Sequence, residues 1–165
     1  GPMSGPTQHV LFLCTGNSCR SVLAEATFNA LAGPEWRAMS AGSHPTGTVH
    51  PRSLALLRRE GISTEGLYSK SWTGLPAIPD IVITVCGNAA GETCPAYLGP
   101  VLRAHWGVED PAKATGSDAE IDAKFEQAYR ILRARIEAFL KLPLDRLRKD
   151  REQFTVELER IAQLS

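Results

Sequence analysis

The chain lacks any long hydrophobic run and any excess of charge. Its longest apolar stretch near the start, Val10 to Cys14, is far too short for the core of a signal peptide or for a membrane span, so neither is expected. Its 18 basic and 18 acidic residues cancel, so nothing in the overall charge favours a nucleic acid or an anionic membrane as a partner. Any electrostatic field that attracts a charged ligand must therefore come from a local group of charges or dipoles.

Cysteine is also scarce, because the 165 residues contain only four. A chain of this length buries enough apolar surface to fold as one domain without disulfides. In the absence of a secretory segment, four cysteines indicate a reducing compartment, where paired thiols are more often catalytic or metal-binding than structural. We therefore expect a cytoplasmic protein whose cysteines carry chemistry.

Short apolar segments alternate with helical patterns along the chain. Four segments predict strands, at residues 9–13, 37–41, 80–85 and 101–106. Apolar periodicity predicts three further elements as helices, at residues 18–31, 50–61 and 119–140. Strands that alternate with helices indicate an α/β fold, with a four-stranded parallel sheet flanked by helices.

The two ends of the chain stand apart from this pattern. The two residues before Met3 look like the remnant of a cleaved tag, and residues 1–8 are expected to be disordered. The predicted domain spans residues 9–142. Residues 143–165 form a C-terminal helical extension, for which the pattern predicts one amphipathic helix over residues 144–164. That helix either packs along the domain or contacts a partner; we expect a monomer.

A cysteine and an arginine bracket the turn that follows the first strand. Cys14 ends the strand, and Arg20 follows the turn formers Gly16, Asn17 and Ser18. Backbone N–H groups in a strand-to-helix loop converge on one point, and the helix dipole adds positive charge there. The Arg20 guanidinium matches two oxygens of an anion, and the same field favours a thiolate at Cys14. This segment predicts an oxyanion cradle with a nucleophilic thiol at its floor.

A structural interpretation of the same segment is a buried cysteine followed by a helix cap at Asn17 or Ser18. The place of this segment in the chain favours the catalytic interpretation. A strand precedes the segment, Gly16 stands where the backbone must approach a ligand, and Ser21 can donate a hydrogen bond to the Cys14 sulfur.

Two further cysteines follow the third predicted strand. Cys86 ends that strand, and Cys94 comes after seven mostly small residues, GNAAGET, whose composition is typical of a mobile loop. Without more cysteine or histidine nearby, the pair does not make a zinc site, so it is either a thiol relay or two packing residues. Because parallel strands end at one edge of a sheet, we expect Cys14 and Cys86 at the same edge.

One stretch of the chain resembles the low-molecular-weight protein tyrosine phosphatase superfamily: residues 14–21, CTGNSCRS, combined with a late Asp-Pro pair at Asp110. Residues 82–95, VITVCGNAAGETCP, are similar to the redox segment of the arsenate reductases built on that fold. The resemblance covers residues 9–142. It implies a three-layer sandwich and the reduction of arsenate to arsenite, an arsenic-detoxification activity.

The resemblance also implies a thiol relay. Arsenate, or phosphate or sulfate as its mimic, would bind the cradle residues Thr15, Gly16, Asn17, Ser18, Cys19, Arg20 and Ser21. The Cys14 thiolate attacks arsenic, Cys86 then attacks the Cys14 sulfur so that arsenite leaves, and Cys94 attacks Cys86 to form a disulfide between them. An external thiol reductant then reduces this disulfide, and no cofactor is bound. Thioredoxin fits two protein thiols better than glutathione with glutaredoxin, because a glutathione route needs fewer of them.

Asp110 matches the general acid of the superfamily, which protonates the departing oxygen. The alternative is a turn-forming aspartate before a proline. In many phosphatases of the superfamily an aromatic residue follows the Asp-Pro pair and stacks on phosphotyrosine. Here Ala112 follows, which argues against phosphotyrosine as the substrate.

Glu25 and Ser40 match positions that line a potassium site in some relatives. Lys70 stands where those relatives carry a carboxylate, so its ammonium group would replace the ion, and no metal is expected to be required.

Several other polar residues are predicted to be structural. Asn17 is expected to hold the loop by bonding its own backbone. Cys19 is expected to pack as a neutral thiol or to form a protective disulfide with Cys14 under oxidation. Three scattered histidines are interpreted as surface or core residues: His44, His50 and His105.

Two rival functions remain open at this point. A phosphatase of the same fold would use Cys14, Arg20 and Asp110 but would have no need of Cys86 and Cys94, whereas a reductase would keep weak phosphatase activity. A thiol redox sensor would show no turnover even with reductant in excess.

Overall fold

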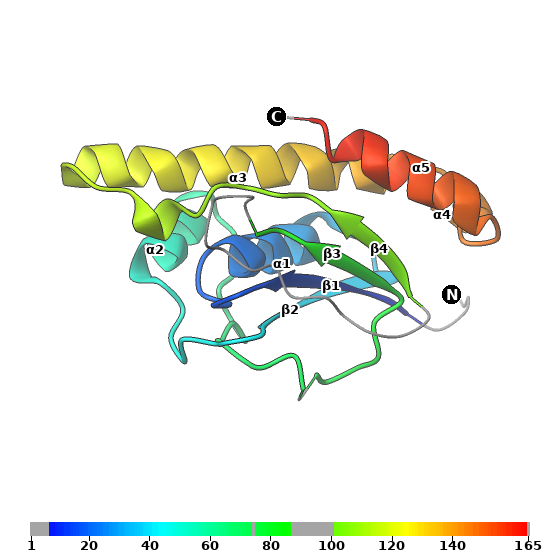
Figure 1. Cartoon of the computed structure of the whole chain (residues 1–165), viewed down its shortest axis with the longest axis horizontal. Helices are drawn as coiled ribbons and strands as arrows, with labels where there is room; N and C mark the ends of the chain where they lie inside the picture. The colour runs from blue at the N-terminus through cyan, green and yellow to red at the C-terminus, as the bar shows by residue number, and fades with distance from the viewer. Residues whose placement is uncertain (1–6, 74, 87–100, 165) are drawn as a thin grey trace.

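The computed structural model describes residues 7–73, 75–86 and 101–164. In these residues four parallel strands form one sheet in the order β2-β1-β3-β4 (Figure 1). The strands are β1 (Gln8–Cys14), β2 (Trp36–Gly42), β3 (Ile81–Thr84) and β4 (Leu102–His105). The predicted α/β class and parallel sheet are confirmed. Each strand boundary lies one residue from its predicted position.

The helices are α1 (Arg20–Leu31), α2 (Pro51–Arg59), α3 (Asp118–Leu140), α4 (Leu144–Leu147) and α5 (Arg151–Ile161), with a short 3₁₀ helix η1 (Pro111–Lys113). Helix α1 connects β1 to β2, α2 lies between β2 and β3, and the remaining helices follow β4. The long helix α3 runs across the molecule beside α1, and α5 lies next to it (Figure 1). None of the helices in the described part of the chain has the length and apolar character needed to cross a bilayer.

Strand β1 lies between β2 and β3, and its inner residues are all apolar and buried. Val10, Phe12 and Cys14 face one apolar cluster, while Leu11 and Leu13 face another. The first cluster is covered by the helices. The second is covered by Trp72, Leu75, Ala77 and Val101 among the described residues. A strand buried on both faces explains the unbroken apolar run in the sequence.

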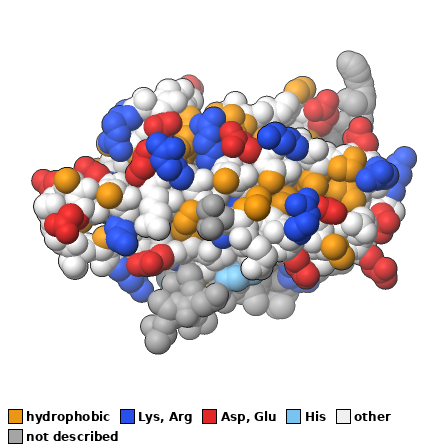
Figure 2. Space-filling view, turned by 90° about the horizontal axis from the view of Figure 1, so that it is seen from above, with side chains coloured by type: hydrophobic (Ala, Val, Ile, Leu, Met, Phe, Trp, Pro, Cys, Tyr) orange, Lys and Arg blue, Asp and Glu red, His pale blue; other side chains and the backbone are white. Residues whose placement is uncertain are grey.

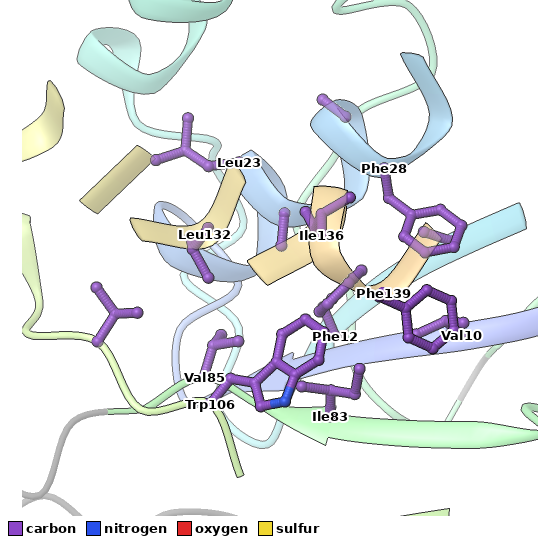
Figure 3. Packing of buried hydrophobic residues seen from close by; sticks show 14 of the residues in the cluster. Val10, Phe12, Leu23, Phe28, Ile83, Val85, Trp106, Leu132, Ile136 and Phe139 are labelled. Atoms are coloured by element: carbon purple, nitrogen blue, oxygen red, sulfur yellow. The ribbon is translucent and has the colours of Figure 1, made fainter. Parts of the chain in front are cut away.

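Aromatic rings fill the space between the sheet and the helices. Phe139 of α3 packs within 5.7 Å of Phe28 and 6.4 Å of Trp106, measured between ring centroids, and Phe12 lies 6.2 Å from Trp106 (Figure 3). Such tilted contacts are typical of aromatic cores. The end of β1 that carries Cys14 is therefore held on a rigid base.

The predicted C-terminal helix is present, but it is shorter than residues 144–164, because α4 ends at Leu147 and a separate helix begins at Arg151. The Asp150 side chain accepts a hydrogen bond from the Gln153 N–H at 3.2 Å and caps a new helix, α5. An aspartate at this position accepts from a first-turn N–H group and starts the next helix.

The residues after 142 pack along the domain instead of projecting from it. Leu147, Phe154, Leu158 and Ile161 are buried in the main apolar cluster. The indole Nε1 of Trp106 donates to the Leu158 carbonyl at 3.1 Å. The terminal helices thus complete the core beside β4.

Charges of both signs are mixed over the outer face of α3 and α5. Lys and Arg side chains alternate there with Asp and Glu (Figure 2). Several make ion pairs within one helix, such as Arg130 with Glu126 at 2.8 Å. This surface agrees with the balanced composition and offers no field of one sign to a polyanion.

We predict that Leu158→Ala lowers the free energy of unfolding by about 3 kcal/mol, because it leaves a cavity in a fully buried site. The matched control on the same helix is Val156→Ala, since Val156 is 54% exposed and its truncation should change stability by about 0.5 kcal/mol or less. Urea unfolding of the two variants measures the difference. Equal effects would mean that α5 does not contribute to the core.

Candidate active site

The loop between β1 and α1 is fixed by hydrogen bonds to its outward-facing carbonyl groups. These bonds come from backbone N–H groups of residues 43–50: Ser43 to Cys14 at 3.3 Å, His44 to Thr15 at 2.9 Å, Thr46 to Gly16 at 3.0 Å and His50 to Ser18 at 3.1 Å. In a planar trans peptide the next N–H points opposite to the carbonyl. The loop N–H groups therefore turn toward its centre, which is the geometry of an oxyanion cradle.

Asn17 holds the most constrained backbone position of this cradle. Its φ of 47° lies in the left-handed region that residues other than glycine seldom adopt. Its side-chain Nδ2 donates to Ser21 Oγ and Ser40 Oγ, each at 2.9 Å, and its Oδ1 accepts from the Lys70 N–H at 2.8 Å. The prediction that Asn17 bonds its own backbone is wrong. The amide instead ties the cradle to α1, β2 and the segment around Lys70.

Cys14 lies at the floor of the cradle with 2% of its surface exposed. Its sulfur is 2.9 Å from Ser21 Oγ, the contact that the sequence predicted, and it accepts a hydrogen bond from the Asn17 N–H at 3.3 Å. Both groups can donate to a thiolate. Ser18 turns its hydroxyl outward to the Thr48 carbonyl at 3.1 Å, so only its backbone faces the cradle.

Arg20 and Asp110 meet at the mouth of the cradle although 90 positions separate them in the sequence. The Nη2 atom of Arg20 lies 3.5 Å from Asp110 Oδ2, and its Nη1 donates to the Val108 carbonyl at 3.0 Å. Arg20 is buried, whereas the Asp110 side chain is 21% exposed. The carboxyl group is thus within reach of both the anion site and solvent, as a proton donor requires.

Asp110 also caps the 3₁₀ helix that follows it. Its Oδ1 accepts a hydrogen bond from the Ala112 N–H at 3.0 Å. The turn-forming role considered for this residue is therefore real, but it engages Oδ1 and leaves Oδ2 facing Arg20. One oxygen of the carboxyl group therefore caps η1 while the other faces Arg20.

Cys86 lies at the same edge of the sheet as Cys14. Leu13 of β1 pairs with Thr84 of β3, and Val85 donates its N–H to the Leu13 carbonyl at 2.9 Å, so Cys86 follows one residue beyond the neighbour of Cys14. Cys86 is fully buried and is part of a disulfide, whereas Cys14 carries a free thiol. Cys94, the third predicted relay thiol, lies outside the described residues.

Cys19 is a free thiol buried at the start of α1. Burial raises its pKa to about 12, and the nearby Asp110 carboxylate acts in the same direction. The thiol therefore stays protonated at physiological pH. This agrees with the expected role in neutral packing.

A partly buried ion pair lies beside the cradle. Lys70 Nζ lies 3.8 Å from Glu25 Oε1, and the same oxygen accepts from Ser40 Oγ at 2.6 Å. Through Ser40 and Asn17 this chain of contacts reaches Ser21, which touches the Cys14 sulfur. Burial raises the pKa of Glu25 and lowers that of Lys70, and in each case the partner opposes the shift.

The Lys70 ammonium thus occupies the neighbourhood of Glu25 and Ser40, where the sequence placed it. In the described part of the chain no three His, Cys, Asp or Glu side chains gather into a group that could hold a metal ion.

Gly42 is a site residue that sequence reasoning missed. A methyl group at this position would clash with the Thr15 carbonyl oxygen and would lie 3.0 Å from the Asn17 nitrogen. The end of β2 therefore needs glycine so that the cradle can close against it. A glycine that ends a strand beside a candidate active site was the signal available in the sequence.

The comparisons with known proteins agree with this geometry. A model of the low molecular weight phosphotyrosine protein phosphatase family matches residues 9–153. The chain belongs to this family. An arsenate reductase of Halalkalibacterium halodurans is 40% identical over 131 residues, and the match covers 79% of this chain and 93% of that protein.

Solved structures in the family support the same assignment. An arsenate reductase from Archaeoglobus fulgidus has a TM-score of 0.67 at 26% identity, covering 81% of this chain and 99% of the other. A thioredoxin-dependent arsenate reductase from Corynebacterium glutamicum has a TM-score of 0.55 at 28% identity, covering 82% of this chain and 64% of the other. The predicted resemblance to the arsenate reductases of the family is confirmed.

We predict that Gly42→Ala weakens oxyanion binding at least tenfold, because the new methyl group pushes the Thr15 and Asn17 backbone out of the cradle. Calorimetric titration with phosphate measures the effect. Gly47→Ala is the control, since a methyl group there meets no atom within 4 Å, although its positive φ adds a small general strain. If both variants bind phosphate equally well, Gly42 does not shape the cradle.

We also predict that Lys70→Met lowers the free energy of unfolding by about 1–2 kcal/mol and slows turnover, because it leaves the partly buried Glu25 carboxylate without its cation. Lys70→Arg should retain more stability, since it keeps the charge. Urea unfolding and steady-state kinetics on p-nitrophenyl phosphate measure both effects. Activity of the unaltered protein should be equal with and without potassium; a dependence on potassium would contradict the role given to Lys70.

Proposed function

We propose that this protein reduces arsenate to arsenite through a relay of cysteine thiols. The observation that carries the proposal is the position of Cys14 and Cys86 at the carboxyl edge of adjacent strands, with Cys14 inside an oxyanion cradle. A phosphatase of this fold needs the cradle and the acid. It has no need of a second redox-active cysteine at the same edge.

In the first step the cradle N–H groups and Arg20 bind arsenate, and the Cys14 thiolate attacks arsenic. A sulfur–arsenic bond forms and one arsenic–oxygen bond breaks. Asp110, at the mouth of the cradle beside Arg20, supplies the proton with which the oxygen leaves as water. Ser21 and the Asn17 N–H stabilise the thiolate before it attacks.

In the second step Cys86 attacks the Cys14 sulfur. A sulfur–sulfur bond forms, the sulfur–arsenic bond breaks, and its electron pair stays on arsenic, which leaves as arsenite. Two electrons have then passed from the thiols to arsenic. Cys94 attacks Cys86 in the third step, which frees Cys14 and leaves a disulfide that an external dithiol reduces by exchange.

The surroundings of Asp110 favour a small inorganic oxyanion over phosphotyrosine. Ala112 follows the Asp-Pro pair and offers no ring on which a phenol could stack. Phosphate fits the same cradle but cannot be reduced in this way, so it acts as a competitor or as a poor substrate through its esters. Weak phosphatase activity therefore accompanies the main reaction.

The reductant belongs to the same proposal. A dithiol protein of the thioredoxin type fits a relay with two resolving thiols, and glutathione with glutaredoxin is the alternative. Such a cycle requires a reducing compartment, which favours the cytoplasm. The protein is proposed to act as a monomer, because the described chain supplies Cys14, Arg20, Asp110 and Cys86 from one subunit.

The decisive experiment is substitution of one thiol at a time. We predict that Cys86→Ser abolishes arsenite release while p-nitrophenyl phosphate hydrolysis continues, because only the second step needs this sulfur. Cys14→Ser should lose both activities, and Asp110→Asn should slow both by about 10²-fold as a proton donor is lost. Arsenite is quantified with thioredoxin and glutaredoxin systems supplied separately.

Persistent arsenite release by Cys86→Ser would overturn the relay. If the unaltered protein hydrolyses p-nitrophenyl phosphate but never releases arsenite, it is a phosphatase. If it does neither with reductant in excess, it is a redox sensor.

A further inference from the structure

Helix α2 begins directly after the segment that holds the cradle, residues 43–50, and His50 is its N-cap. The backbone N–H of His50 donates to the Ser18 carbonyl at 3.1 Å, which is one of the bonds that keep the cradle carbonyls outward. Its side-chain Nδ1 accepts a hydrogen bond from the Arg52 N–H at 3.1 Å. The sequence interpreted His50 only as a surface or core residue. In the structure this one residue contacts both the cradle and the first turn of α2.

Histidine is an unusual residue to cap a helix, because its acceptor nitrogen can take up a proton near neutral pH. The preferred caps are serine, threonine, asparagine and aspartate, and none of them titrates in that range. A neutral imidazole whose Nδ1 accepts from Arg52 carries its proton on Nε2. An imidazolium carries a proton on both nitrogens and cannot accept this bond. The cap therefore exists only in the neutral form of His50.

Three elements surround the imidazole ring. Helix α3 presents the ring of Phe125, whose centroid lies 4.8 Å from that of His50. The charged neighbours are Arg52 on α2 and Asp110 on the loop after β4. Burial lowers the pKa of His50 from its ordinary value, the Arg52 guanidinium acts in the same direction, and the Asp110 carboxylate opposes them. The surroundings thus favour the neutral imidazole that the cap requires.

The other charges at the start of α2 are engaged with one another. Arg52 binds Asp122 of α3 at 2.6 Å and Asp118 at 2.7 Å, which joins α2 to the first turns of α3 (Figure 1). Asp110 Oδ2 faces Arg20 at 3.5 Å. The two carboxylates of α3 therefore neutralise Arg52. An imidazolium at the cap would stand against the positive end of the α2 dipole.

We propose that His50 is a positioning residue for the oxyanion cradle and that it works only as a neutral imidazole, an inference that rests on the proposed function. Protonation of Nδ1 breaks its bond to the Arg52 N–H and places a cation at the positive end of α2. His50 then turns away, and its backbone N–H releases the Ser18 carbonyl. The N–H group that follows this carbonyl, that of Cys19, loses its inward direction. The cradle then binds oxyanions less well.

Sulfate is the probe for this effect, because it keeps both negative charges over the range in which histidine titrates. Its affinity is measured by calorimetric titration at about pH 7.5 and about pH 5. The comparison variant is His50→Asn, which keeps a side-chain acceptor that does not titrate. Relative to this variant, the unaltered protein should lose about fivefold in sulfate affinity between the two pH values. Every other titrating group is common to both proteins, so its effect cancels in the comparison.

Two further variants serve as controls. At about pH 7.5, His50→Ala should bind sulfate about fivefold more weakly than the unaltered protein, because it has no cap at any pH. His9→Asn, which removes a histidine from the opposite end of the sheet, should follow the unaltered protein at both pH values.

Coinciding pH profiles of the unaltered protein and His50→Asn would overturn the proposal. So would a relative gain in sulfate affinity of the unaltered protein at low pH, because the imidazolium would then act on the anion through its charge alone. Full sulfate affinity in His50→Ala would show that the cap does not hold the cradle.

Urea unfolding is a second measurement, and it needs no ligand. The pKa of His50 is lower in the folded state, so the unfolded chain takes up the proton first as the pH falls. The contribution of the cap is fully present above the ordinary pKa of histidine and is lost as the pH falls through the lower pKa of the folded state. The free energy of unfolding of the unaltered protein should therefore fall relative to that of His50→Asn in this window. A constant difference would contradict a cap that depends on the neutral imidazole.

These outcomes are distinct from those that test the proposed function, since neither measurement involves arsenic. If sulfate binding shows the expected dependence on pH but the unaltered protein releases no arsenite, the proposed function fails and the role of His50 stands. If arsenite is released and the pH profiles of the two proteins coincide, only the role given to His50 fails.

Discussion

The candidate site depends on the direction in which a few peptide groups point. Backbone N–H groups of residues 43–50 hold the carbonyl oxygens of the loop after β1 on its outer side, which turns the loop N–H groups inward. Asn17 secures the strained turn with three side-chain hydrogen bonds. Because these dipoles are fixed before any ligand arrives, binding an oxyanion there requires little reorganisation. The thiol of Cys14 lies beneath the same dipoles.

Strand order brings the rest of the chemistry to this point. A central β1 with β3 as its neighbour places Cys14 and Cys86 at one edge of the sheet, and the loop after β4 brings Asp110 to Arg20. Residues from three strand ends therefore surround the place where an anion would bind. The position agrees with the general rule that parallel sheets bind ligands at the carboxyl ends of their strands.

The strands, the main helices and the cradle could be predicted from the sequence because their signals are local. An apolar run, a turn and an arginine six residues after a cysteine mark the cradle in the sequence, although residues 42–50 are needed to hold its shape. The partners of Asn17 and the need for glycine at Gly42 could not be predicted, since each joins elements distant in sequence. The break before α5 was missed because the apolar stripe continues across it and only Asp150 marks the new cap.

One guanidinium group links Leu164 to the backbone that follows β4. Arg135 donates from Nε to the Leu164 carbonyl at 2.9 Å and from Nη1 to the Gly107 carbonyl at 3.2 Å. The Leu164 carbonyl thus helps to orient the Arg135 side chain, whose Nη1 in turn holds the Gly107 backbone after β4. Loss of this one side chain would release both carbonyl groups together, so residues 151–164 and the backbone after β4 share this anchor.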